Sequence, residues 1–145
     1  MSESAAEEKV LESLSLFVPG NPVSQGRGRI VRVGKFSKIA DPIESRNWKN
    51  YVKVIASECR CDPLWEGPLR IIIRFGFLRP KSISKKVIWR DKKPDIDNVF
   101  KACADALEGI IYRNDSQIVG VKMTKKYSDT PGVSIQIEQI DGRKP

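Results

Sequence analysis

Residues 99–109 most restrict what this chain can form, because their apolar and polar positions separate onto two faces of a helix. One face holds Val99, Phe100, Cys103, Ala106, Leu107 and, just beyond, Ile110. The opposite face, reached at steps of four, four and three residues, holds Asp97, Lys101, Asp105 and Glu108. The first face therefore belongs to a core, and the second lines something polar.

Strand patterns lie on both sides of this helix. Runs rich in β-branched and aromatic residues predict strands at 13–18, 69–78, 117–126 and 133–140, and a small hairpin around Gly34. Asp41 and Pro42 are typical of a helix start, and the apolar stripe that follows predicts a helix ending near Arg60. The turn at residues 129–132 predicts that the last two strands pair antiparallel.

The size of the chain favours one domain. With 145 residues, 40% of them hydrophobic, the chain can bury one compact core. Residues 1–12 are polar and acidic, and we expect a disordered tail there, followed by a single domain over residues 13–145. Three cysteines without a metal-binding spacing favour a reducing compartment. No apolar run is long enough to span a bilayer and no signal pattern opens the chain, so we expect a cytoplasmic protein without membrane contact.

The charge favours nucleic acid as a partner. The net charge is +8, and beyond residue 12 there are 25 Lys or Arg against 14 Asp or Glu, or +11. Such a surplus suits phosphate binding with release of counterions, although a basic protein can also simply be soluble. The chain has no histidine. Any hydrolysis must therefore rely on carboxylates, lysine and bound water.

Two basic segments are candidates for DNA contact. The first, rich in glycine, carries Arg27, Arg29, Arg32 and Lys35. Glycines let the backbone approach a phosphate and arginines bind it with two hydrogen bonds, but a solvated loop explains this segment equally well. The second, residues 79–93, has seven Lys or Arg, among them Lys85, Lys86, Arg90, Lys92 and Lys93. We favour DNA contact for it over a solvated loop, because it leads directly into an acidic motif.

That acidic motif contains Asp95 and Asp97, and Asp115 follows further on. Asp95 does not fit the polar helix face, so we place it in an extended segment after Pro94, where it can converge with Asp97. Asp97 or Asn98 then caps the helix. A strand beginning near Asp115 could bring all three acids to one end of a sheet. In a basic chain, carboxylates near DNA make sense with bound Mg²⁺, which prefers oxygen ligands and contacts phosphate.

Metal-bound carboxylates would support phosphodiester hydrolysis. Mg²⁺ can activate water and neutralise the leaving oxygen, and Lys101 could offset charge in the transition state. The alternative is that the aspartates only cap helices and turns, because an Asp-x-Asp pair is common in such positions. The spacing does not match an EF-hand, and one metal ion or two are equally open.

The sequence resembles the RusA family of Holliday junction resolvases, which are phage-type endodeoxyribonucleases. The resemblance lies in Pro94-Asp-Ile-Asp-Asn-Val-Phe-Lys101, in Asp105-Ala-Leu107 with Gly109, in Asn114-Asp-Ser-Gln-Ile118 and in the segment from Pro19 to Arg29. It implies a single two-layer α/β (α+β) domain of βαβαββ order, with a mixed sheet and helices packed on it. It also implies a homodimer that nicks four-way DNA junctions in pairs, with Mg²⁺ as cofactor and Mn²⁺ as a substitute.

The resemblance also assigns roles to residues. Asp95, Asp97 and Asp115 would bind the metal and Lys101 would assist catalysis. Apart from the resemblance, we expect Asn98, Asp105 and Asn114 to lie beside the metal ligands and support them, with Asp105 otherwise a structural group on the Lys101 face. Asn114 departs from the family, which usually has a second aspartate there, so the number or affinity of metals is open. Gly28 replaces the usual proline of the basic loop. Two other functions remain as alternatives: a non-catalytic DNA-binding module, and a general nuclease of branched, flap or single-stranded DNA.

Overall fold

The computed structural model describes residues 9–26, 29–40 and 43–144, with the backbone alone at 29–33 and 36–40. Its elements follow the order β1 (Val10–Pro19), β2 (Arg29–Val33), β3 (Phe36–Ala40), α1 (Ile43–Ala56), β4 (Leu69–Leu78), α2 (Ile96–Leu107), β5 (Ile118–Ser128) and β6 (Gly132–Ile140). Short 3₁₀ turns follow α1 at Ser57–Cys59 and precede β5 at Asp115–Gln117. This single domain with a mixed sheet and two helices confirms the predicted α+β fold.

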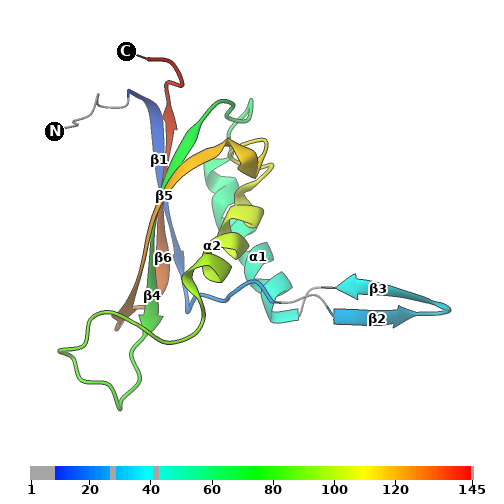
Figure 1. Ribbon diagram of the computed structural model, residues 1–145, viewed down its shortest axis with the longest axis vertical. Helices are drawn as coiled ribbons and strands as arrows, with labels where there is room; N and C mark the ends of the chain where they lie inside the picture. The colour runs from blue at the N-terminus through cyan, green and yellow to red at the C-terminus, as the bar shows by residue number, and fades with distance from the viewer. Residues whose placement is uncertain (1–8, 27–28, 41–42, 145) are drawn as a thin grey trace.

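The four longer strands form one sheet in the order β1-β6-β4-β5. β6 pairs antiparallel with both β1 and β4, whereas β4 and β5 are parallel. α2 connects the parallel pair, so it runs from one end of the sheet back to the other. Figure 1 shows α1 and α2 together on one face of this sheet, which leaves the other face open.

The predicted pairing of the last two strands is wrong. β5 and β6 follow each other through a tight turn, but β4 lies between them. Val133, Ile135 and Ile137 explain this position, since all three are at most 1% exposed and belong to a strand with a neighbour on each side. The turn residues indicated that the chain reverses there, and they did not indicate which strand β6 joins.

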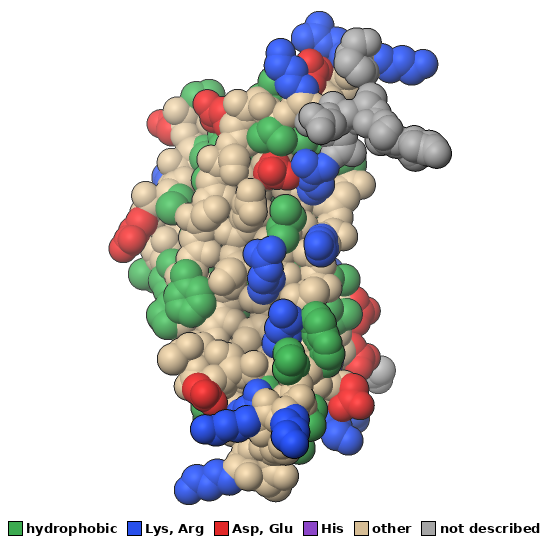
Figure 2. Space-filling model, turned by 90° about the vertical axis from the view of Figure 1, so that its left-hand side faces the viewer, with side chains coloured by type: hydrophobic (Ala, Val, Ile, Leu, Met, Phe, Trp, Pro, Cys, Tyr) green, Lys and Arg blue, Asp and Glu red, His purple; other side chains and the backbone are tan. Residues whose placement is uncertain are grey.

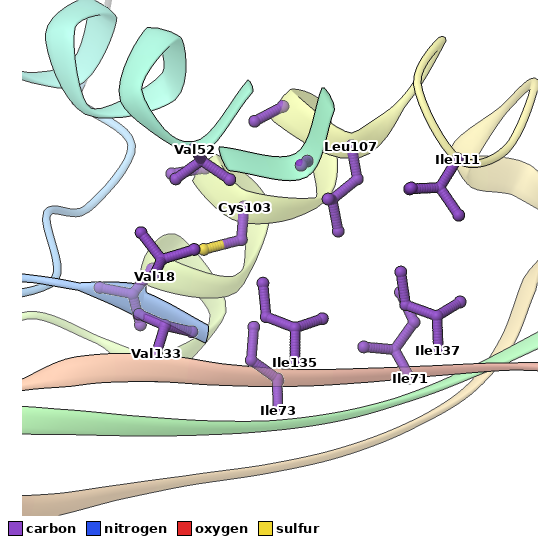
Figure 3. Packing of buried hydrophobic residues seen from close by; sticks show 14 of the residues in the cluster. Val18, Val52, Ile71, Ile73, Cys103, Leu107, Ile111, Val133, Ile135 and Ile137 are labelled. Carbon is purple, nitrogen blue, oxygen red and sulfur yellow. The ribbon is translucent and has the colours of Figure 1, made fainter. Parts of the chain in front are cut away.

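The core fills the space between the sheet and the helices. Alternate residues of β4 point to this side, and Ile71, Ile73 and Phe75 are each 1% exposed. From α2 come Cys103 and Leu107, in agreement with the predicted apolar face. Figure 3 shows Cys103 and Leu107 between Val52 of α1 and the sheet side chains Ile71 and Ile73, with Val18 of β1 nearby. Burial of this face fixes α2 on the sheet and leaves its polar face toward solvent.

Some boundaries differ from the sequence prediction. β1 begins at Val10, so three residues assigned to the tail belong to the sheet; residues 1–8 lie outside the described residues. The predicted hairpin is present as β2 and β3, paired antiparallel around Gly34, which has a positive φ of 60°. Figure 1 shows this hairpin projecting from the body of the molecule. Within the described residues, no helix is long and apolar enough to cross a membrane.

We predict that Phe75→Ala destabilises the protein by about 3–5 kcal/mol, because Phe75 is fully buried and the substitution leaves a cavity between β4 and the helices. Urea unfolding followed by circular dichroism measures the change. Val54→Ala is the control, because Val54 is 68% exposed and should change the free energy of unfolding by less than about 0.5 kcal/mol. Equal losses in both variants would contradict this description of the core.

Candidate active site

Asp95 and Asp97 lie at the start of α2, and both are exposed. Asp95 has an extended backbone, with φ −65° and ψ 143°, as predicted. It is itself the N-cap residue, so the prediction that Asp97 or Asn98 caps the helix is wrong: the helix begins at Ile96 and includes both. The carboxylate of Asp95 makes no capping hydrogen bond. Because capping does not occupy this carboxylate, it is available to a ligand.

An open pocket of about 520 Å³ lies beside Asp95. One wall is formed by Lys93, Pro94, Asp95 and Asn98, and the other by Pro22, Val23 and Ser24. A backbone hydrogen bond connects the two walls, because the amide of Gln25 donates to the carbonyl of Asn98 over 3.0 Å. The N-terminal segment thus reaches the acidic motif just before the predicted basic loop begins.

Ser45 of α1 anchors the same N-terminal segment. It is 2% exposed, accepts a hydrogen bond from the amide of Gly26 and donates one to the carbonyl of Ser24, at 2.8 and 3.0 Å. A buried hydroxyl with both functions satisfied fixes the backbone on either side of it. Both helices therefore determine where the basic loop leaves the domain.

Lys125 of β5 holds the segment that leads into Asp95. Its ammonium donates to the carbonyls of Lys92 and Pro94, over 2.7 and 2.6 Å. Arg90 supports the segment as well, since its guanidinium donates to the carbonyl of Lys93 and lies over the rings of Phe77 and Tyr127. Charged donors make the stronger hydrogen bonds in proteins, so these two residues fix the entry to α2.

Lys101 lies one turn after Asp97 and is exposed. Asp105, one turn further along the same face, pairs with Lys49 of α1 at 3.7 Å, and 30% of its side chain is exposed. This ion pair links the two helices. The polar face of α2 therefore carries charge along its whole length, as its sequence pattern indicated.

Asp115 lies at the other end of α2. Asn114 caps the 3₁₀ turn there, with its side-chain oxygen accepting from the amide of Ser116 over 2.8 Å, and Gln117 completes the capping box. The amide of Asp115 donates to Glu108, the residue that follows α2, over 3.0 Å. Asn114 therefore uses its side-chain oxygen locally, while the carboxylate of Asp115 is exposed.

The pKa of the Tyr112 hydroxyl responds to the negative charge at this end of α2. It is fully buried and donates a hydrogen bond to the carbonyl of Ala104 over 2.7 Å. Burial strongly raises the pKa of its hydroxyl, and the negative charges of Glu108, Asp115 and Asp105 raise that pKa further. Glu108 is the residue that follows α2 and accepts the hydrogen bond from the amide of Asp115, so these two acids lie at the C-terminal end of the helix.

One protomer does not bring the three predicted metal ligands together. α2 has 12 residues, and at about 1.5 Å per residue it separates Asp95 from the Glu108 end by about 18 Å. Among the described residues, no three Asp, Glu, Cys or His side chains form a group that could hold a metal ion. The prediction that all three acids lie at one end of the sheet is wrong, because a helix joining parallel strands begins and ends at opposite ends.

The predicted DNA-binding residues differ in their exposure and in how much of each the structure describes. Lys85, Lys86, Lys92 and Lys93 are exposed on the segment between β4 and α2, and Lys35 is exposed at the tip of the hairpin. Arg90 is instead occupied with the interactions described above. Arg27 lies outside the described residues, and for Arg29 and Arg32 the structure describes only the backbone, in β2. These lysines all precede the acidic motif in the chain, and Lys92 and Lys93 lead directly into it.

The sequence alone did not single out Lys125, because its role depends on a contact between residues far apart in the chain. The open face of the sheet carries further basic residues that were not predicted, and Figure 2 shows Lys and Arg side chains along it. They include Arg74 of β4 and Lys122 of β5, which are exposed. The alternation of side chains along β4 and β5 could have indicated that these residues share one face of the sheet. It could not have indicated that this face stays uncovered.

Comparisons with known proteins identify similar sequences over most of the chain. A family model described as endodeoxyribonuclease RusA matches residues 19–138. The chain is also 35% identical over 141 residues to the uncharacterized protein YqaN of Bacillus subtilis (strain 168), covering 90% of this chain and 99% of that protein. The matched region includes the N-terminal segment, both helices and both groups of acids.

The chain belongs to the RusA family. Membership confirms the predicted class of enzyme, an endodeoxyribonuclease, and supports Holliday junctions as the substrate. A RusA-family nuclease of this kind binds branched DNA, which agrees with the exposed lysines beside the acidic motif.

We predict that Lys125→Met loosens the entry to α2 while the fold persists. Losing two hydrogen bonds from a charged donor should speed hydrogen exchange by about 10-fold or more in peptides covering residues 92–99. Lys122→Met is the matched control, since Lys122 is exposed on the same strand and should leave the exchange of these peptides unchanged. Unchanged exchange in Lys125→Met would show that other contacts fix this segment.

Proposed function

We propose that the chain is an Mg²⁺-dependent endonuclease that resolves four-way DNA junctions by paired nicking, as a homodimer, in recombination and repair. The observation that carries the proposal is the exposed pair Asp95 and Asp97, of which Asp95 lines an open pocket, with exposed lysines just before the pair in the chain. Family membership supports the same activity. A four-way junction approximates two-fold symmetry, so a two-fold dimer offers it two equivalent sites.

The chain's own residues suggest how a junction is bound. Lys92 and Lys93 precede the acidic motif and are exposed, so they can contact backbone phosphates of the strand to be cut. Lys85 and Lys86 extend this basic surface along the segment after β4. Contacts of this kind follow the backbone, so they select the branched shape more than the base sequence.

Other residues suggest how cleavage is assisted. Lys101, on the same face of α2 as Asp97, can offset negative charge that develops on the phosphate. Asp95, Asp97 and Asp115 remain the proposed metal ligands, and Mg²⁺ would supply an activated water there when bound. The three carboxylates of one protomer do not fit a single ion, because α2 keeps Asp115 apart from the other two.

That separation favours a second candidate function, a DNA-binding module without catalysis. In such a module Asp95 would be only a helix cap, yet its side chain makes no capping hydrogen bond. A general nuclease of flap or single-stranded DNA is the third possibility. The choice of DNA substrates distinguishes all three.

We expect the purified protein to nick four-way junctions when Mg²⁺ or Mn²⁺ is present and to lose this activity with a chelator. Linear duplex, flap and single-stranded DNA of the same sequence serve as comparison substrates and should be cut far more slowly. Denaturing gels of end-labelled strands measure the rates. Equal cleavage of all substrates would indicate a general nuclease. If no substrate is cleaved, the DNA-binding module is the function that agrees with the result.

In the same assay, Asp95→Asn and Asp97→Asn should reduce cleavage by about 100-fold or more while junction binding persists. Asp129→Asn is the matched control, because Asp129 is exposed in the turn between β5 and β6 and belongs to neither group of acids. Full activity in Asp95→Asn and Asp97→Asn would exclude these carboxylates from the chemistry.

A further inference from the structure

The open face of the sheet, which lies away from α1 and α2, provides an interaction surface (Figure 1). Strand alternation and register determine which side chains point to it. Phe17 of β1, Ser134 of β6, Arg74 of β4 and Thr124 of β5 form one row across this face. Among the described residues, no helix covers the row. Its side chains can therefore meet a partner.

The open face is positively charged. Arg74, Lys122 and Lys126 point to it by the same register, and all three are exposed. Within the four described strands of the sheet, Glu138 is the only acid directed to this face, and Arg70 pairs with it at 2.7 Å. Figure 2 looks onto the face and shows Lys and Arg side chains along its middle. The face therefore attracts a polyanion.

Phe17 offers an aromatic ring on the β1 side of the open face. It is 51% exposed, and its ring lies against Gly132 of β6, where a Cβ would overlap it. Gly132 is paired with Gly76 of β4, so two neighbouring strands have no side chain at this level. A hollow of about 380 Å³, lined in part by Phe17, Arg74 and Gln136, lies on the same face. The ring thus rests on the sheet beside an open, partly polar hollow.

Trp89 offers a second ring on the β5 side. It is 58% exposed and forms an antiparallel bridge with Lys126, so its side chain points to the open face as well. Two backbone hydrogen bonds of 2.9 and 3.2 Å fix the chain on either side of Trp89. The ammonium of Lys126 lies 4.6 Å from the centre of the ring, in a cation–π contact. An exposed ring on a fixed backbone suits a ligand with flat aromatic groups.

We propose that the open face binds a single strand of DNA, with bases stacked on Phe17 and Trp89 and phosphates paired with Arg74, Lys122 and Lys126. The chemistry of these residues identifies the ligand, because unpaired bases stack on aromatic side chains and their phosphates match the cations. In duplex DNA the bases stack on one another, so their faces are not available to the two rings. The inference goes beyond the proposed function, because binding here needs neither a metal nor cleavage.

The distance between the two rings fits several nucleotides. β6, β4 and β5 lie between β1 and the segment that contains Trp89. At about 4.8 Å per strand, the rings are roughly 20 Å apart across the sheet. A DNA strand that runs from one ring to the other crosses the cations in between. Surfaces of this kind hold about 4–16 nucleotides.

Other occupants match these residues less well. A second copy that docks through the same face would bring like charges together. An acidic protein would match the cations but would leave the two rings without flat partners. A DNA strand held here lies across the sheet from α2, so we expect it to be bound without being cut.

Removing each ring tests the stacking. Fluorescence anisotropy measures binding of a labelled oligothymidylate of about 16 nucleotides, with a chelator present so that no metal contributes. Phe17→Leu and Trp89→Leu keep an apolar side chain and should each weaken binding by about 10-fold or more. Tyr51→Leu is the matched control, because Tyr51 is 40% exposed on α1, on the other side of the sheet, and its loss should not change the affinity. Thermal melting checks that each variant is folded.

The two edges of the face must respond together. A loss of binding in Trp89→Leu alone would place the strand on the basic segment before α2 and overturn the proposal. Unchanged binding in both variants would overturn it as well, and so would an equal loss in Tyr51→Leu.

The dependence of binding on salt tests the cations separately from the rings. Contacts from Arg74, Lys122 and Lys126 predict a slope of about −2 when the logarithm of the binding constant is plotted against that of the salt concentration. Arg74→Gln should make this slope shallower by about 0.7, whereas Trp89→Leu should weaken binding without changing it. Lys53→Gln, at an exposed position of α1, is the matched control and should leave the slope unchanged. An unchanged slope in Arg74→Gln would overturn the proposal.

These measurements do not depend on junction cleavage. If the protein binds the oligonucleotide through this face but cuts no junction, the single-strand surface stands and the proposed function fails. If it cuts junctions but Phe17→Leu and Trp89→Leu bind the oligonucleotide as the wild type does, only the single-strand surface fails. A changed mass of the Phe17→Leu protein in light scattering, with unchanged oligonucleotide binding, would assign the face to another copy of the chain and overturn the proposal.

Discussion

The parallel pairing of β4 with β5 is the constraint on which the rest of the structure depends. Two parallel strands that are neighbours require a connection that returns along the sheet, and α2 provides it. The buried face of α2 fixes this helix over β4, so its polar face and its two ends are placed as well. The acids in the connection are then distributed along the helix, with Asp95 and Asp97 at its start and Asp115 beyond its end.

Charged side chains fix the segment before α2, which the core does not hold. A core positions α2, but the segment before it has few buried groups and depends on Lys125 and Arg90, which donate to its carbonyls. Their positive charge also favours a nearby anion, so the same residues that fix the backbone add to the attraction for phosphate. At the acidic motif the same charged residues therefore contribute to both stability and binding. In the core, by contrast, stability comes from the burial of apolar side chains.

Local patterns in the sequence predicted the elements well and their partners poorly. The two faces of residues 99–109 predicted α2, and the extended backbone of Asp95 followed from its mismatch with the polar face. Strand periodicity predicted β5 and β6 but not that β4 separates them, because a reversal of the chain does not specify which edge the next strand joins. The same limit explains why the acids were expected together: the sequence indicates that a helix links them, and only the topology shows that the helix keeps them apart.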